Sequence, residues 1–598
     1  MYIRKSKTRS VNDSTYYSYR LVESVRQSNG KVKQQTLLNL GSNYSFPEDQ
    51  WPLLSDRVNN ILTGALSLFT LEPVVENEAQ RLANLIIHKH GCSIETSNSE
   101  SVHEPIDINS VENSEVKSIG AEFLAFETAN ALGLHELLLE VGLNKKQADL
   151  SLASIIGRLL SPGSDVSTCN YLRNNSALDE VMDVDFSSIH KRQMYESSDL
   201  LWKHKDQIES KLYNREKDLF KFEEMVTLYD LTNTYFEGES RSNDNAAFGR
   251  SKEKRCDCKL VTLALVLDSS GFPKKSHIFK GNVSEGTTLK EMVSLASKEA
   301  IVIMDAGIAT EENIEWLSNN NYKYLVISRK RNKQLPGNVD GVEVKSEEGN
   351  KVTAYIVKPD DSSELEMYCH SESMERRADT IKDKFKERFL TELKKLSEGL
   401  TKKGCMKKYT KIIEKIGKLK ERHKLVSHLY NIEVSANKDN KLAEKITWEY
   451  IHDKNENTSG IYCIRTNQQA LNHQEVWDTY RMLNDIEAAF RILKTDLGLR
   501  PIYHQKTDRI SGHIFISLLA YHLLHTIRYQ LKNNGIHDSW ATIHTKLVNH
   551  FRITTSMQKE NGKVIHIRKS MRPNPDQLAI YQACGVNSVP LNTIISKY

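Results

Sequence analysis

Two short apolar segments, each ending in an aspartate, constrain this chain more than any other feature. VTLYD ends at Asp230, and IVIMD ends at Asp305. Short apolar runs of this kind are typical of β-strands buried on both faces, and a charge at the end of such a strand needs a partner. Either aspartate alone could cap a helix. Two strands that end in the same way instead indicate a shared site.

The segments around the two aspartates predict a mixed α/β core. MVTLYDLTNTYFEG, KLVTLALVLD and KKSHIFKGN have the pattern of strands, TLKEMVSLASKEA that of a helix, and IVIMD that of a short strand. Three strands, a helix and a strand in this order suit a ribonuclease-H-like core, in which acidic residues lie at adjacent strand ends. We expect one further strand at Tyr324–Ser328.

The chain has 598 residues, which exceeds a single hydrophobic core, so several domains are expected. We predict a multidomain α/β protein whose core is interrupted by a β/α insertion and preceded by a β-hairpin and an all-α domain. The expected boundaries are 1–92 for the hairpin and a helix, a candidate region for DNA-end binding, 93–115 for a polar linker, 116–222 for the all-α domain, 223–330 and 456–535 for the two parts of the core, 331–455 for the insertion with Lys-rich helices, and 536–598 for a C-terminal appendage.

Positive charge is local in this sequence. The net charge of +4 comes from 82 basic and 78 acidic residues, so any nucleic-acid surface must be a patch. The strongest basic run, 402–424, has ten Lys or Arg against two Glu. It is a candidate DNA-contact arm, or else a charged helical hairpin whose stripe of Ile412, Ile416 and Leu419 packs on a neighbour. The hairpin around Asn29-Gly30 carries basic residues that could contact phosphates or form a solvated face, namely Arg20, Arg26, Lys31 and Lys33.

The sequence predicts a cytoplasmic protein. MYIRKSKTRS at the N-terminus has positive charges but no apolar stretch after them, unlike a secretion signal. The longest apolar stretch, Ile514–Leu524, contains His522 and is too short to cross a bilayer of about 30 Å. We therefore expect no membrane partner.

A third carboxylate is expected on a long helix predicted over 474–496. Tyr480, Glu487 and Lys494 are spaced by seven within YRMLNDIEAAFRILK, and each step of seven drifts by only about 20° around a helix. The three side chains would therefore share one face, with Glu487 on a metal and the other two on the DNA backbone. Arg491 could join the phosphate contacts or pair with Glu487 at i,i+4. The bland alternative is an ordinary amphipathic helix.

These three carboxylates suit phosphodiester chemistry. Cleavage without a covalent intermediate needs an activated water or 3′-hydroxyl and a stabilised leaving oxygen, which two metal ions about 3.5 to 4 Å apart can supply. Mg²⁺ prefers carboxylate oxygens and leaves positions for water and phosphate. Asp230, Asp305 and Glu487 are therefore the candidate catalytic and metal-binding residues, with two Mg²⁺ ions as cofactors and Mn²⁺ able to substitute.

At this point several segments together carry a resemblance. YDLTNTYFEG, GRSKEKR, GNVSE, IVIMDAG and YRMLNDIEAAFRILKTDLGLRPIYH resemble insertion-sequence DDE transposases of bacteria, in the IS-four superfamily and its branch with a long N-terminal region. The superfamily signature is Tyr, two residues, Arg, three residues, Glu, six residues, Lys. Tyr480, Glu487 and Lys494 match it, whereas Leu483 stands at the Arg position. Arg481 or Arg491 could take over the phosphate contact of that arginine.

The resemblance implies a function. It implies a ribonuclease-H-like fold with an insertion between the second Asp and the Glu, binding to the terminal inverted repeats of a mobile element, and cut-and-paste transposition through hairpinned ends. It also implies double-stranded DNA as partner, at the transposon ends and at the target, and a homodimer in which each subunit cuts the end bound by the other.

Further residues near the expected site have two interpretations each. The loop after the first catalytic strand could grip DNA or be a solvated hairpin, and Asn282 and Glu285 in GNVSE could support the site or merely form a turn. A nuclease that never joins DNA would share the three acids, and a DNA-binding protein with a decayed core would be expected to have lost some of them. The basic residues of the loop are Arg250, Lys252, Lys254 and Arg255.

Overall fold

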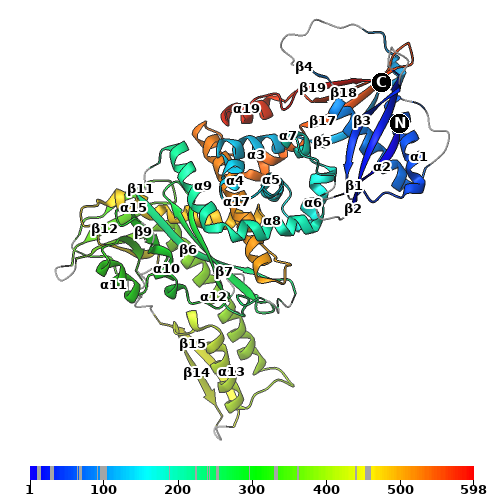
Figure 1. Ribbon diagram of the computed structural model, residues 1–598. Helices are drawn as coiled ribbons and strands as arrows, with labels where there is room; N and C mark the ends of the chain where they lie inside the picture. Colours follow the sequence, from blue (N-terminus) through cyan, green and yellow to red (C-terminus); the bar gives the residue numbers. More distant parts are fainter. Residues whose placement is uncertain are drawn as a thin grey trace. The chain divides into compact units, whose positions relative to one another are not determined.

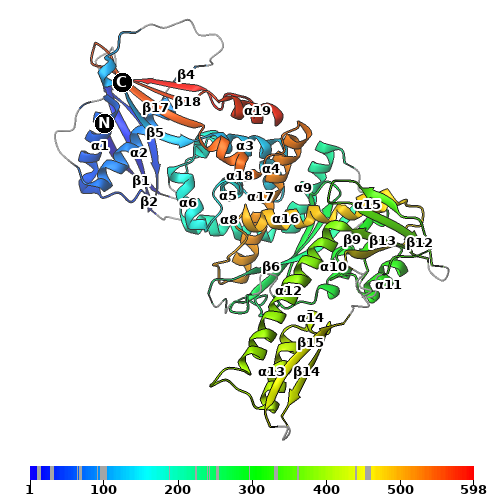
Figure 2. The same ribbon diagram turned by 180° about the vertical axis from the view of Figure 1, so that it is seen from behind.

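The computed structural model describes the chain in two compact units (Figures 1 and 2). The first, here the helical unit, comprises Met1–Lys221, Asn233–Val261 and Ala489–Tyr598, and the second, here the sheet unit, comprises Phe222–Thr232 and Thr262–Ala488. The structure describes all residues except 10–14, 27–31, 43, 64, 66–70, 91, 95–103, 188, 223–224, 239, 241–242, 251–254, 295–296, 329–333, 338, 360–362, 438–440 and 452–458.

A nine-stranded mixed sheet contains both aspartate-ending segments. Its order is β11-β12-β13-β16-β10-β9-β6-β7-β8, and β9 runs parallel to both β6 and β10. The predicted succession of three strands, a helix and a strand is confirmed as β6, β7, β8, α10 and β9. The bounds are β6 Val226–Tyr235, β7 Leu260–Asp268, β8 Pro273–Lys280, α10 Leu289–Val293, β9 Ile301–Met304, α11 Glu311–Asn319, β10 Lys323–Ile327, β11 Val342–Lys345, β12 Val352–Val357, β13 Leu365–Ser371 and β16 Ile461–Thr466.

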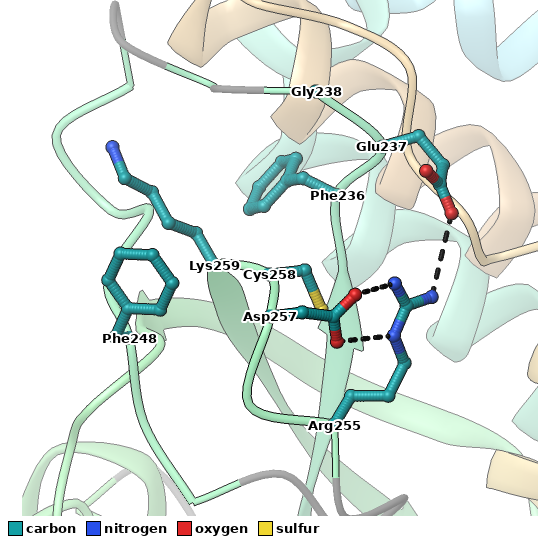
Figure 3. A pocket seen from close by; sticks show the side chains of 8 residues that line it. All are labelled: Phe236, Glu237, Gly238, Phe248, Arg255, Asp257, Cys258 and Lys259. Atoms are coloured by element: carbon teal, nitrogen blue, oxygen red, sulfur yellow. Dashed lines mark hydrogen bonds and ion pairs between the residues drawn. The ribbon is translucent and has the colours of Figure 1, made fainter.

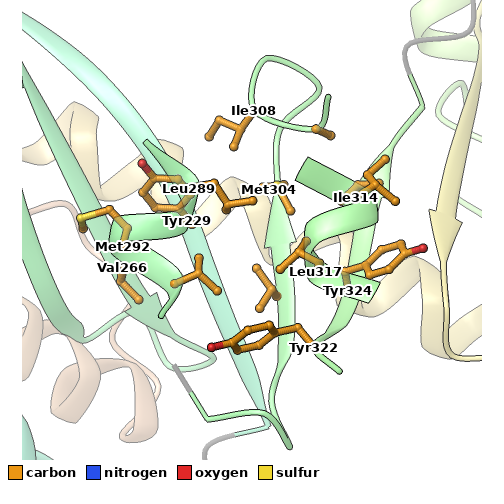
Figure 4. Packing of buried hydrophobic residues seen from close by; sticks show 14 of the residues in the cluster. Tyr229, Val266, Leu289, Met292, Met304, Ile308, Ile314, Leu317, Tyr322 and Tyr324 are labelled. Carbon is orange, nitrogen blue, oxygen red and sulfur yellow. The ribbon is translucent and has the colours of Figure 1, made fainter. Parts of the chain in front are cut away.

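Apolar side chains on one face of this sheet pack under α10 and α11 (Figure 4). Tyr229 from β6, Met304 from β9 and Tyr324 from β10 share this cluster with Leu289 and Leu317 from the helices. β7 is buried along its whole length, as its unbroken apolar sequence predicts for a central strand. The cluster holds β6 on the N-terminal side of Asp230 and the end of β9 before Asp305. The prediction that a strand ends at Asp230 was wrong, because β6 continues to Tyr235.

Within the sheet unit, the long helix α12, Glu372–Gly399, leads away from the strands to a small subdomain (Figures 1 and 2). This subdomain contains α13 Tyr409–Arg422, α14 Lys424–Ser427, β14 Tyr430–Ala436 and β15 Ala443–Tyr450. Ile412, Ile416 and Leu419 are buried in its core with Phe389, so the apolar stripe predicted for the Lys-rich run does pack on a neighbour. The strands β11 to β13, which precede α12, instead extend the central sheet beside β16.

The helical unit contains the predicted run of helices and one long helix from later in the sequence. α17 packs against α3, α5 and α8. By length and composition alone, α17 is the one helix of the described residues that could cross a membrane, yet 94% of its apolar window is buried inside the protein. The bounds are α3 Gly120–Ala131, α4 Leu134–Glu140, α5 Lys145–Leu160, α6 Asp165–Asn174, α7 Leu178–Met182, α8 Lys191–Lys203, α9 Lys205–Phe220 and α17 Thr507–Asn533.

The N-terminal part of the helical unit is a three-stranded antiparallel sheet covered on one face by two helices. β2 and β3 confirm the predicted hairpin, although its Asn29-Gly30 turn lies outside the described residues. β1 adds a strand that the sequence pattern did not predict. The bounds are β1 Tyr2–Arg9, β2 Thr15–Arg26, β3 Val32–Gly41, α1 Trp51–Thr63 and α2 Pro73–His90.

A five-stranded sheet of order β4-β19-β18-β17-β5 is built mostly from the C-terminal residues. β5 includes residues that polar composition assigned to a linker. Its backbone pairs with β17, and an edge strand can be polar because it needs only main-chain hydrogen bonds on one side. The bounds are β4 Cys92–Ile94, β5 Glu112–Ser118, α18 Trp540–Val548, β17 Phe551–Gln558, β18 Val564–Ser570, α19 Pro575–Ala583 and β19 Thr593–Lys597.

Candidate active site

Asp230 and Asp305 lie at neighbouring positions in the central sheet. The parallel register of β6 and β9 pairs Tyr229 with Met304. Asp230 is the next residue of β6, and Asp305 directly follows the last residue of β9. The Oδ1 of Asp230 accepts a hydrogen bond from the N–H of Leu231 at 2.7 Å, and the Oδ1 of Asp305 accepts one from the N–H of Ala306 at 2.7 Å. Asp230 is half-buried and Asp305 is exposed, so the pair lies at the edge of the core and within reach of solvent.

A hydrogen-bonded chain supports β6 at Tyr229, the residue before Asp230. The hydroxyl of Tyr229 donates to the Oγ1 of Thr288 at 2.6 Å, and the hydroxyl of Thr288 donates to the carbonyl oxygen of Glu285 at 2.7 Å. Burial raises the pKa of Tyr229, and the negative charges of Asp230 and Glu285 add to this rise. The tyrosine therefore stays protonated and remains a donor beside the carboxylates.

Glu285 lies against the loop that follows Asp305. A Cβ placed on Gly307 would be 2.2 Å from the Oε2 of Glu285 and 3.9 Å from the Oδ2 of Asp305. Both carboxylates therefore face the space that glycine leaves open. The amide of Asn313 donates to the carbonyl oxygens of Gly286 at 2.7 Å and Ile308 at 2.8 Å, which ties the two loops together. Of the two interpretations of Glu285, the turn is present as the 3-10 helix Glu285–Thr287, and its side chain also borders the aspartates.

The helix expected to carry Glu487 is two helices. α15 spans His473–Arg481 and α16 spans Leu483–Thr495, with a turn at Met482. The N–H of Met482 bonds to the carbonyl oxygens of Thr479 and Tyr480, which tightens the last turn of α15. The prediction of one continuous helix over 474–496 was wrong. The spacing of Tyr480 and Glu487 therefore crosses the junction between the two helices.

Tyr480 lies in an electrostatic environment to which both Glu487 and Asp305 contribute. Its ring packs on Trp477 at 5.8 Å and on Tyr462 at 5.7 Å between ring centroids. Burial raises the pKa of Tyr480 to about 12, and the negative charges of Cys369, Asp305 and Glu487 contribute to that rise. The charges of Asp305 and Glu487 thus both act on the phenol of Tyr480. Glu487 is exposed on α16.

The remaining signature positions lie along α15 and α16. Arg481 is exposed at the end of α15, and its charge assists Lys345 and Asn350 in lowering the pKa of Glu347. Arg491 is exposed and Lys494 is half-buried in α16. Of the two alternatives for Arg491, the i,i+4 ion pair with Glu487 is not formed among the described residues. Leu483, at the position of the signature arginine, begins α16 half-buried.

The loop predicted to grip DNA lies in the helical unit. Arg250 is exposed, whereas Lys252 and Lys254 lie outside the described residues. Arg255 is engaged within the protein, because its Nε donates to Asp257 at 3.0 Å, its Nη1 lies 3.5 Å from Glu237, and its guanidinium stacks over Tyr235 at 4.6 Å. Its hydrogen bond lowers the pKa of Asp257 to about 2.

These residues border a cavity of about 490 Å³ (Figure 3). Arg255 and Asp257 form one side of it, and Phe248 and Lys259 form the other. Phe248 is 63% exposed. The sequence motif gave no signal for this cavity, because its wall is formed by residues on both sides of the basic loop.

The donor types at the strand ends fit a hard divalent cation. Asp230, Asp305, Glu487 and the neighbouring Glu285 provide only carboxylate oxygens, which are the ligands that Mg²⁺ prefers. In the described part of the chain, no three His, Cys, Asp or Glu side chains are close enough together to hold a metal ion. Coordination would therefore require the side chains to turn toward a shared position.

Two protein-family models match this chain. A family model described as a transposase DDE domain matches residues 221–523, a range that includes both aspartate-ending strands, α15 and α16. A second model, the N-terminal domain of IS1634 family transposases, matches residues 3–50, which include the three-stranded sheet. A search of curated proteins gives no match.

Proposed function

Because this chain belongs to the insertion-sequence transposases with a DDE domain, we propose that it binds the terminal inverted repeats of its own element and moves it by metal-dependent cleavage and strand transfer. The observation that carries the proposal is the register of β6 and β9, which makes Asp230 and Asp305 neighbours. The order β8-β7-β6-β9-β10 supports a ribonuclease-H-like core.

Asp230, Asp305 and Glu487 are the proposed ligands of two Mg²⁺ ions, for which Mn²⁺ can substitute. When bound, the ions activate the attacking water or 3′-hydroxyl and stabilise the leaving oxygen. The backbone beside each aspartate is held by the buried cluster that contains Tyr229 and Met304.

Positively charged and hydroxyl side chains hold the DNA in this proposal. Tyr480 keeps its proton because its pKa is about 12, so it can donate a hydrogen bond to a phosphate oxygen near Asp305 and Glu487. Lys494, Arg491 and Arg481 contact the backbone from α15 and α16, and Arg250 and Lys252 contact it from the basic loop. Arg255 contributes to the shape of that loop through Asp257 and Glu237 rather than through a free guanidinium.

We further propose that a homodimer assembles on the paired element ends and acts on target DNA. Leu483 cannot make the phosphate contact of the signature arginine. In this chain, Arg481 or Arg491 must hold the DNA strand that the arginine would hold. The intact set of three acids supports a working enzyme.

A strand-transfer assay tests this function. A labelled duplex carrying the inverted repeats that flank the coding region is incubated with the full chain, a target plasmid and Mg²⁺. We expect cleavage at the repeat end and covalent joining to the plasmid, both abolished by Asp230→Asn. Cleavage without any joined product would identify a nuclease instead, and cleavage that survives Asp230→Asn would remove the metal site as assigned.

A further inference from the structure

The N-terminal sheet β1-β2-β3 has one apolar face and one polar face. Ile3, Leu21 and Leu38 pack into the cluster formed with α1 and α2. Because side chains alternate between the faces of a strand, Arg4 and Arg20 project from the opposite face, and both are exposed. The polar face is therefore open to solvent.

The register places two arginines directly opposite each other on this open face. Arg4 pairs with Arg20 in the antiparallel ladder of β1 and β2, and Arg20 pairs with Asn39 of β3. Like charges at opposed positions destabilise a sheet. Among the described residues, neither arginine forms an ion pair. Their charge is therefore left for a partner outside this chain.

Neutral polar side chains surround the guanidinium group of Arg4. The Nη1 of Arg4 donates to the Oε1 of Gln34 at 2.7 Å, and the amide of Gln34 donates to the hydroxyl of Tyr2. Val22 lies on β2 between Arg20, which pairs with Arg4, and Ser24, which pairs with Gln34, and its side chain is only 2% exposed. This network orders Arg4 over the sheet without neutralising it.

Lys5, on the packed face of the same sheet, shows the opposite arrangement. Lys5 forms an ion pair with Glu48 and lies over the ring of Tyr17 at 4.8 Å. Glu23 is the only acidic residue within the three strands, and it alternates onto the packed face with Leu21. The charge of Lys5 is thus compensated, unlike that of Arg4 and Arg20.

We propose that the open face of β1-β2-β3 binds the sugar–phosphate backbone of duplex DNA and that Arg4 and Arg20 contact phosphates. That this DNA is the end of the mobile element rests on the proposed function. Guanidinium, amide and hydroxyl donors are the groups that contact phosphate and sugar in DNA complexes. Single-stranded DNA is bound instead on aromatic stacking platforms, and Tyr2, 39% exposed, is the only aromatic ring that alternates onto this face with a described side chain.

The test is the salt dependence of DNA binding by the full chain, measured by fluorescence anisotropy in EDTA with a labelled mixed-sequence duplex. The variant Arg4→Ala/Arg20→Ala should bind about tenfold or more weakly, and the slope of log affinity against log salt should fall by about two, because each phosphate contact contributes about 0.9. Arg4→Lys/Arg20→Lys should restore the slope. The matched control Lys5→Ala/Arg57→Ala removes the same charge from groups already paired with Glu48 and Glu76, and it should leave the slope unchanged.

An unchanged slope in a folded Arg4→Ala/Arg20→Ala variant would overturn the proposal, as would an effect confined to the single strand of the same sequence. Folding is checked by circular dichroism, and the Lys variant keeps the test valid if the Ala variant unfolds. Because EDTA removes any need for catalysis, failure of the strand-transfer assay would count against the proposed function and leave this surface standing. Normal strand transfer together with an unchanged slope would support the proposed function and rule out this DNA-binding surface.

Discussion

Gly307 shows how a single residue can control the candidate site. A Cβ there would lie 2.2 Å from the Oε2 of Glu285, so the Gly307→Ala variant must displace that carboxylate from beside Asp305. We expect cleavage to fall by about 10- to 100-fold, since small displacements of reacting groups have effects of that order. Gly417→Ala on α13 is the control, because nothing lies within 4 Å of its Cβ. A wild-type cleavage rate for Gly307→Ala would show that Glu285 does not matter.

Glu487 gives a second prediction at this scale. Glu487→Gln keeps the shape of the side chain but weakens its affinity for a hard cation. Duplex binding in an anisotropy assay should stay within about twofold of wild type, while cleavage is lost. Asp478→Asn, an exposed acid on α15, is the control and should cleave normally. Retained cleavage in Glu487→Gln would exclude Glu487 from the metal site.

At the scale of secondary structure, the sequence predicted the strands better than the helices. The apolar run before Asp305 matches β9, and the run before Asp230 forms the first half of β6, which continues to Tyr235. The parallel pairing makes the two aspartates neighbours. The turn at Met482 was not predicted, since no Gly or Pro marks it. Glu285 could only be weighed as a turn or a support, because its closeness to Asp305 depends on a loop contact across Gly307.

α16 carries a prediction of its own through Lys494. If this half-buried lysine contacts the DNA backbone, then Lys494→Ala should weaken duplex binding and reduce the slope of log affinity against log salt by about one. Lys418→Ala on α13, where the lysine is paired with Glu414 at 2.8 Å, is the charge-matched control. Identical binding across a salt series for Lys494→Ala and wild type would contradict the contact.

The buried triad of Glu180, Arg552 and Arg568 joins α7 to β17 and β18 within the helical unit. Burial alone would raise the pKa of Glu180, but the two arginines outweigh it and lower that pKa to about 2. The unfolded value is near 4.3, so this stabilisation is complete above that pH and is lost as the pH falls toward 2.

Glu180→Gln should therefore lower the unfolding free energy of this unit by about 3 to 5 kcal/mol at neutral pH, because two buried arginines lose their partner. The difference from wild type, measured by urea unfolding, should shrink as the pH falls from about 4 to 2. A difference that stays constant over this range would mean that the carboxylate charge is not what stabilises the triad.

At the scale of the whole molecule, composition and motifs predicted several domains around a mixed α/β core, and the structure contains such a core. Which segments would pack together could not be predicted. α17 packs among helices far earlier in the sequence, and β5 pairs with β17 despite its polar residues, because long-range pairing leaves little trace in local composition. The opposed pair Arg4 and Arg20 likewise emerges only from the strand register.

The most direct test of the central claim is the metal dependence of cleavage by Asp305→Cys. A thiolate is a poor ligand for Mg²⁺ and a better one for softer divalent ions such as Mn²⁺. If Asp305 binds the catalytic metal, the variant should fail to cleave an end-bearing duplex in Mg²⁺ and recover cleavage in Mn²⁺, while Asp305→Ala stays inactive in both. Cleavage by Asp305→Cys at the wild-type rate in Mg²⁺ would contradict the assignment.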